Sequence, residues 1–125
     1  MLDHVTIGVR DLNRSQMFYD ATLKPLGIER LYAEGEIFAG YGIGSKAFFW
    51  IGQRDGQQTG THVAFTAQGR DVVDKFHRAA LVAGGVDNGG PGLRPHYHAS
   101  YYGAFILDPD GHNIEVVCHF PVATP

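Results

Sequence analysis

Three residues with metal-binding side chains lie far apart in this 125-residue sequence: His4, His62 and Glu115. In proteins, two neutral imidazoles and one carboxylate hold divalent Fe, Mn, Zn, Ni or Co and leave coordination positions open to water or a substrate. A metal held in this way acts as a Lewis acid on a substrate that binds through oxygen atoms. The three residue types therefore predict a site for one divalent metal, provided that the fold brings them together.

An internal repeat indicates that the fold brings these three residues together. A shift of 58 positions places His4 on His62, and it also superposes residues of the same kind along the following helix. The matching pairs are Val5 and Val63, Phe18 and Phe76, Ala21 and Ala79, Leu23 and Leu81, and Gly27 and Gly85. We interpret the chain as one domain, 1–125, made of two modules at about 1–57 and 58–120.

Each module predicts the same order of elements, βαβββ. Alternating strands open the modules at 4–9 and 62–66, and a helix with apolar residues at helical spacing follows each of them. Asp11 is the expected N-cap of the first helix, which Pro25 ends near Lys24; Asp71 opens the second. A hairpin closes each module, formed by 37–43 with 47–51 and by 101–107 with 113–118. The predicted fold class is α+β, two paired βαβββ modules forming a cupped mixed sheet.

The second module carries about seven extra residues, because its last strand aligns with the first module only at a shift of 65. The extra residues lie in 89–98, a stretch rich in Gly, Pro and His that predicts an irregular loop. His96 and His98 of this loop are candidate acid–base residues, with an ordinary exposed loop as the alternative. Tyr101 and Tyr102 follow on an expected strand, where only one of them can face the metal, and we expect Tyr102.

The repeat also predicts a four-residue site, because Trp50 is the equivalent of Glu115 in the first module. If the modules pair about a twofold axis, Trp50 faces the predicted metal ligands. We expect Trp50, Phe49 and Phe105 to line the substrate pocket as an aromatic wall, although Phe49 and Trp50 also suit an ordinary core.

Composition excludes several classes of function. The net charge is −3 and the ten Lys and Arg residues are scattered, which argues against nucleic acid as a partner. No apolar run is long enough to span a bilayer and Met1 is not followed by a signal-peptide pattern, so we expect a cytoplasmic protein. Cys118, the lone cysteine, is expected in the core, and His77 and His112 at the surface.

Three segments carry a family resemblance: Asp3-His4-Val5-Thr6-Ile7-Gly8-Val9, Gly60-Thr61-His62-Val63-Ala64-Phe65, and Asp108-Pro109-Asp110-Gly111-His112-Asn113-Ile114-Glu115. With them the chain resembles the vicinal-oxygen-chelate superfamily, the glyoxalase, bleomycin-resistance and extradiol-dioxygenase group. The resemblance implies a metal at the centre of the cup, a small substrate that chelates through adjacent oxygens, and a homodimer. It leaves open whether the two modules of one cup come from one chain or from two.

Departures from the family pattern bear on the activity. By resemblance, Trp50 stands where glyoxalase I enzymes have a glutamate that serves as both ligand and base. The fosfomycin-resistance transferases hold a phosphonate with basic residues, and here His119 is the only basic residue after Glu115. Extradiol dioxygenases usually have a tyrosine ten positions before the glutamate, where this chain has Phe105. Phe105 argues against a dioxygenase, but His96, His98, Tyr101 and Tyr102 resemble the acid–base residues of that group. We expect a metal-dependent, dioxygenase-like enzyme. The alternatives are a glyoxalase-like lyase or isomerase of the lactoylglutathione lyase type, and a metal-free ligand-sequestering resistance protein.

Overall fold

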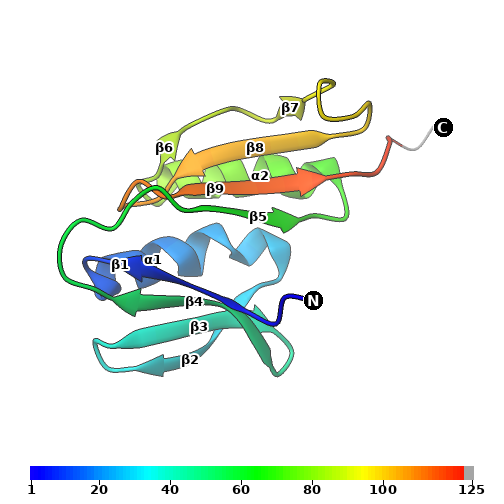
Figure 1. Ribbon diagram of the computed structural model, residues 1–125. Coiled ribbons are helices and arrows are strands. Elements are labelled where there is room, and N and C mark those ends of the chain that lie inside the picture. The colour runs from blue at the N-terminus through cyan, green and yellow to red at the C-terminus, as the bar shows by residue number, and fades with distance from the viewer. Residues whose placement is uncertain (123–125) are drawn as a thin grey trace.

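The computed structural model describes residues 1–122 and contains two modules of like topology (Figure 1). The first comprises β1 (Val5–Val9), α1 (Leu12–Thr22), the 3-10 turn η1 (Lys24–Leu26), β2 (Glu29–Glu34), β3 (Phe38–Ile43) and β4 (Lys46–Gln53). The second comprises β5 (His62–Thr66), α2 (Arg70–Val82), β6 (Val86–Asp87), β7 (Gly92–Leu93), β8 (Tyr102–Leu107) and β9 (Asn113–Cys118). The predicted α+β fold of two βαβββ modules is confirmed, with the short β7 as an addition within the long loop.

Local sequence signals set the helix ends. The Asp11 carboxylate accepts a hydrogen bond from the backbone N–H of Arg14 at 3.1 Å, which confirms Asp11 as an N-cap. Gly69, not Asp71, is the N-cap of α2, and Asp71 lies in its first turn. After α2 the chain turns at Gly84, whose φ of +102° favours glycine. No helix within residues 1–122 has the length and apolar character needed to cross a membrane.

The strand register confirms the repeat. The first sheet has the order β1-β4-β3-β2 and the second the order β5-β9-β8-β6, with β7 also paired to β8. In both modules the first strand runs parallel to the last, with Thr6 opposite Trp50 and Ala64 opposite Glu115. Because a shift of 58 relates Thr6 to Ala64, Trp50 and Glu115 occupy equivalent places in the two sheets.

One face of each sheet packs into a single shared core. The two helices cover this face and lie behind the sheets in Figure 1. Ile7 and Val9 of β1 are buried there, while Thr6, next to Ile7, is exposed on the opposite face. Phe49 and Phe65 join the modules within the core, with ring centroids 5.3 Å apart. Each sheet therefore keeps one face free of helices, which we call the open face.

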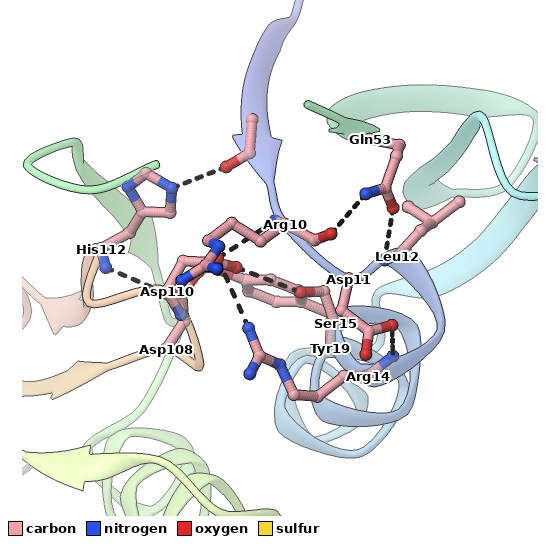
Figure 2. A network of polar contacts seen from close by, with 11 residues as sticks. Arg10, Asp11, Leu12, Arg14, Ser15, Tyr19, Gln53, Asp108, Asp110 and His112 are labelled. Atoms are coloured by element: carbon pink, nitrogen blue, oxygen red, sulfur yellow. Dashed lines mark hydrogen bonds and ion pairs between the residues drawn. The ribbon is translucent and has the colours of Figure 1, made fainter. Parts of the chain in front are cut away.

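A buried polar turn in the second module ties it to the first (Figure 2). Asp108 is 4% exposed and accepts hydrogen bonds from the Tyr19 hydroxyl of α1 and from the backbone N–H groups of Asp110 and His112. The pKa of Tyr19 is raised well above its ordinary value because its phenol is buried and faces the Asp108 carboxylate. The phenol therefore keeps its proton and donates a hydrogen bond to Asp108.

His112 of the same turn corrects the expectation that it lies at the surface, because it is only 2% exposed. Its Nδ1 accepts a hydrogen bond from the backbone N–H of Thr61, so its Nε2 carries the proton and donates to the Gly8 carbonyl at 2.8 Å. Asp110 adds a bond from the Arg10 backbone N–H at 3.1 Å. These contacts join β1 and the start of α1 to the β8–β9 turn.

Replacing Asp108 with alanine tests this linkage. Asp108→Ala leaves the buried Tyr19 hydroxyl and two backbone donors without their acceptor, and we expect the free energy of unfolding to fall by about 3 kcal/mol. Asp55→Ala, at an exposed loop position, is the matched control and should change stability by less than about 0.5 kcal/mol. Urea denaturation followed by circular dichroism measures both. Equal stability of the two variants would contradict a structural role for the turn.

Candidate functional site

The structure brings the predicted site residues together in pairs, one pair on each sheet. On the second sheet, His62 Nε2 lies 2.9 Å from Glu115 Oε1. On the first sheet, His4 and Trp50 line one pocket. Within residues 1–122 of one chain, no three His, Cys, Asp or Glu side chains gather closely enough to hold a metal ion. His4 is therefore not beside the other two predicted ligands in a single chain.

Glu115 is the buried charged group of the second sheet's open face. Its residue is 2% exposed, and its second carboxylate oxygen, Oε2, accepts a hydrogen bond from the Tyr101 hydroxyl. Burial, and then this bond to the carboxylate, raise the pKa of Tyr101 well above its ordinary value. At neutral pH the phenol holds its proton and presents it to Glu115.

Tyr101, not Tyr102, is the tyrosine beside the predicted ligands, so the expected orientation is wrong. Tyr102 faces helix α2, where its hydroxyl donates to Asp74 at 2.7 Å and the Arg70 guanidinium lies 5.0 Å from its ring centroid. The bond to Asp74 raises the pKa of Tyr102. Successive strand residues point to opposite faces, which is why only one of the two can reach Glu115.

A pair of histidines lies next to Tyr101. His98 Nδ1 accepts a hydrogen bond from the backbone N–H of Ser100, so its Nε2 carries the proton and donates to His119 Nδ1 at 2.9 Å. The rings of His98 and His119 lie 5.5 and 5.3 Å from the Tyr101 ring. His96 packs instead on Tyr97, with centroids 4.2 Å apart. Sequence reasoning missed His119, because the only signal was another titratable residue four positions after Glu115.

Two of the three predicted pocket aromatics lie on an open face, and the third does not. Phe105 lies beside His62, with ring centroids 6.2 Å apart, and the Arg94 guanidinium covers its ring. Trp50 lines the pocket on the first sheet. Phe49, in contrast, is 0% exposed in the shared core and cannot line a pocket. The reason is again strand alternation, since neighbouring residues face opposite ways.

Trp50 lies flat on the first sheet because Gly40 opposite it has no side chain. A Cβ at Gly40 would lie 2.6 to 2.7 Å from three carbons of the indole ring. Tyr32 is nearly parallel to Trp50, with centroids 5.8 Å apart, and Phe38 meets it edge-on at 5.6 Å. The pocket that Trp50 lines has His4 but no carboxylate, so nothing in its wall replaces a glutamate base.

His4 marks the edge of the same pocket and has its own charged partner. Its Nδ1 lies 2.8 Å from Asp3 Oδ1, and the Lys46 ammonium lies 2.6 Å from the same oxygen. The hydrogen bond from Lys46, with that of His4, lowers the pKa of Asp3. His4 Nε2 makes no hydrogen bond or ion pair among residues 1–122 and is the nitrogen left to bind a metal.

Together the fold and the paired site residues define a chain of two βαβββ modules that carries one half of a possible metal site on each sheet. The model of the Glyoxalase/Bleomycin resistance protein/Dioxygenase superfamily matches residues 1–116. This chain belongs to that superfamily.

Solved structures support the same assignment. A glyoxalase/bleomycin resistance protein from Albidiferax ferrireducens is 32% identical, with a TM-score of 0.81 and coverage of 97% of this chain and 99% of that one. A glyoxalase-related enzyme from Fulvimarina pelagi is 18% identical, with a TM-score of 0.76 over 99% of this chain and 93% of that one. The fosfomycin resistance protein FosX from Mesorhizobium loti is 22% identical, with a TM-score of 0.68 over 94% and 91%. The last two share the fold. No protein of curated function matches the chain.

Gly40→Ala tests the placement of Trp50. The added methyl group would overlap the indole, so we expect the ring to leave the sheet and its fluorescence emission to shift to longer wavelength as water reaches it. Trp50 is the only tryptophan of the chain, so the emission reports on it alone. Gly90→Ala is the control, because a Cβ there meets no atom within 4 Å. An unchanged spectrum for Gly40→Ala would contradict the flat ring.

Proposed function

We propose that this protein is a homodimeric, metal-dependent enzyme acting on a small substrate that chelates the metal through adjacent oxygens. One site would use His62 and Glu115 of one chain with His4 of a second copy. The metal would be one of Fe, Mn, Zn, Ni or Co, which suit two imidazoles and a carboxylate.

The observation that carries this proposal is the environment of Glu115. Its side chain is only 3% exposed, yet its partners are an imidazole and a phenol, and no Lys or Arg forms an ion pair with it among residues 1–122. Burying a carboxylate without a cation is costly, so such a group marks a place for a positive charge. His62 Nε2 and Glu115 Oε1, 2.9 Å apart, fit a cation that binds both.

A second copy is proposed because His4 belongs to the other half of the site. The fold leaves an open face on each sheet, and the first carries His4 while the second carries His62 and Glu115. Large apolar side chains are exposed at the rim of the first sheet and in the 88–101 loop, namely Tyr32, Ile37, Leu93 and Tyr97. Contact between the first module of one copy and the second module of another would bury them.

When bound, the metal would polarise the substrate oxygens and stabilise negative charge that develops on them. The surrounding side chains suit proton transfer. Tyr101 orients Glu115 and holds a proton at its hydroxyl oxygen. The His98–His119 pair, packed against Tyr101, could move a proton between Nε2 of His98 and Nδ1 of His119. His96, packed on Tyr97, would lie further out in the same loop.

Among reactions we propose a dioxygenase-like activity first. The Trp50 pocket has an aromatic wall and lacks a carboxylate base, which favours a planar ring over the substrate of a glyoxalase-like lyase. The iron-loaded protein should consume oxygen with catechols, followed with an oxygen electrode and by ring-cleavage absorbance. If instead the nickel or zinc form acts on hemithioacetals, the lyase alternative holds.

Mixed dimers test whether the site is shared between copies. His4→Ala and Glu115→Ala should each reduce metal content to near zero in the homodimer, because each removes one ligand from every site. In a heterodimer of the two variants, one site has all three ligands and the other lacks two. Two different affinity tags other than polyhistidine allow the heterodimer to be isolated, and plasma mass spectrometry should find one metal per heterodimer.

The outcomes of this experiment separate the rival models. If the heterodimer contains as little metal as the two homodimers, a site formed between copies is contradicted. Trp50→Ala is the control and should retain its metal. If the unmutated protein binds none of Fe(II), Mn(II), Ni(II) or Zn(II) after reconstitution, the metal-free ligand-sequestering alternative replaces the enzyme.

The adjacent tyrosines offer a matched pair for the role of Tyr101. Tyr101→Phe removes the hydroxyl that orients Glu115, and we expect metal affinity to fall about 10- to 100-fold. Tyr102→Phe removes an equal hydroxyl on the helix-facing side and should leave the affinity unchanged. Competition with a fluorescent chelator measures both. Equal losses would contradict a specific contact between Tyr101 and the metal site.

A further inference from the structure

The pocket on the open face of the first sheet combines aromatic walls with an arginine, and the proposed metal binding accounts for neither. Its volume is about 360 Å³, which suits a small molecule. Its walls are the aromatic rings of Trp50 and Phe38, with Ile37 beside them. A cavity of this size and lining favours a flat, apolar group in contact with the indole face.

One end of this pocket carries a cation. Arg54 is exposed, and it forms no ion pair with a carboxylate among residues 1–122; its Nη1 donates only to the Gln53 carbonyl at 2.8 Å. Glycines let the side chain lie against the sheet: a Cβ at Gly52 would be 2.9 Å from Arg54 Nη1, and one at Gly8 would be 2.9 Å from Arg54 Cγ. The remaining guanidinium donors are free for a planar, two-oxygen acceptor.

His4 and Arg54 mark opposite ends of the pocket. His4 directly precedes β1 and lies two residues before Thr6, and Arg54 packs over Gly8, two residues after Thr6. Trp50 pairs with Thr6 and so lies between them. At about 3.3 Å per strand residue, the two ends are separated by roughly 13 Å of backbone, with the indole at the middle.

We propose that the substrate is a planar aromatic ring with a carboxylate at the end opposite its metal-binding oxygens, the ring lying on Trp50 and the carboxylate held by Arg54. This substrate class rests on the proposed function for its metal-binding end alone. Its other end requires only the first sheet. A singly charged carboxylate matches the single guanidinium, and the aromatic ring matches the wall.

Fluorescence of Trp50 tests the proposal directly, because it is the only tryptophan. Benzoate should change the emission saturably, whereas benzamide, its neutral analogue, should bind at least about tenfold more weakly because it cannot form a charge-assisted bond. Acetate, which has the charge without the ring, should bind more weakly than benzoate as well. Equal affinities for benzoate and benzamide would overturn the proposal.

Two arginine variants complete the test. Arg54→Gln should weaken benzoate binding about tenfold or more and leave benzamide binding unchanged. Arg78→Gln, at an exposed position on α2, should have no effect on either. An unchanged benzoate affinity in Arg54→Gln, or no saturable signal in the unmutated protein, would contradict the pocket assignment.

Metal analysis of the same samples keeps this proposal separate from the metal site. Benzoate preference in a protein that binds no metal would reject the metal-dependent function and support the Arg54 pocket. A metal-loaded protein with no preference for benzoate would support the metal-dependent function and reject the Arg54 pocket.

Discussion

The sharing of one apolar core by both sheets is the constraint on which the rest of the structure depends. Each sheet gives one face to that core and to the helices, so strand alternation assigns every neighbouring residue to the other face. Ile7 goes inward and Thr6 outward; Phe49 goes inward and Trp50 outward. Trp50 of β4, His62 of β5 and Glu115 of β9 thereby lie on the open faces. A shift of one residue in the register would reverse these assignments.

The polar turn between β8 and β9 fixes the position of one module on the other within this apolar packing. A hydrophobic core alone tolerates small sliding movements of one module on the other, whereas buried hydrogen bonds require particular partners. The Asp108 carboxylate bonds to its own turn and to Tyr19 of the first module, and the His112 imidazole bonds to the Gly8 carbonyl of the first module (Figure 2). These contacts hold the two open faces in one arrangement, with His4 away from Glu115 in the single chain.

The two open faces have different chemical characters. The second collects a buried carboxylate, imidazoles and a phenol around Glu115, groups that bind cations and carry protons. The first collects aromatic rings and one arginine around Trp50, groups that bind a flat anion. Repeat-equivalent positions thus carry side chains of different chemistry, Trp50 in one module and Glu115 in the other. A site that combines the two would have metal-binding groups on one wall and substrate-binding groups on the other.

Much of the fold and of the candidate site was determined by the sequence itself, because these features depend on local or periodic signals. The 58-residue repeat, the Asp11 cap, the hairpins and the buried Cys118 follow from spacing and turn chemistry, and the family from three short segments. Only the tertiary structure decided that Tyr101 rather than Tyr102 meets Glu115, since either choice fits an alternating strand until its partner strand is fixed. It also decided that His98 meets His119, 21 positions away, and that His112 is buried against Gly8. These contacts join distant segments, and their geometry comes from the packing of the modules, which no local pattern records.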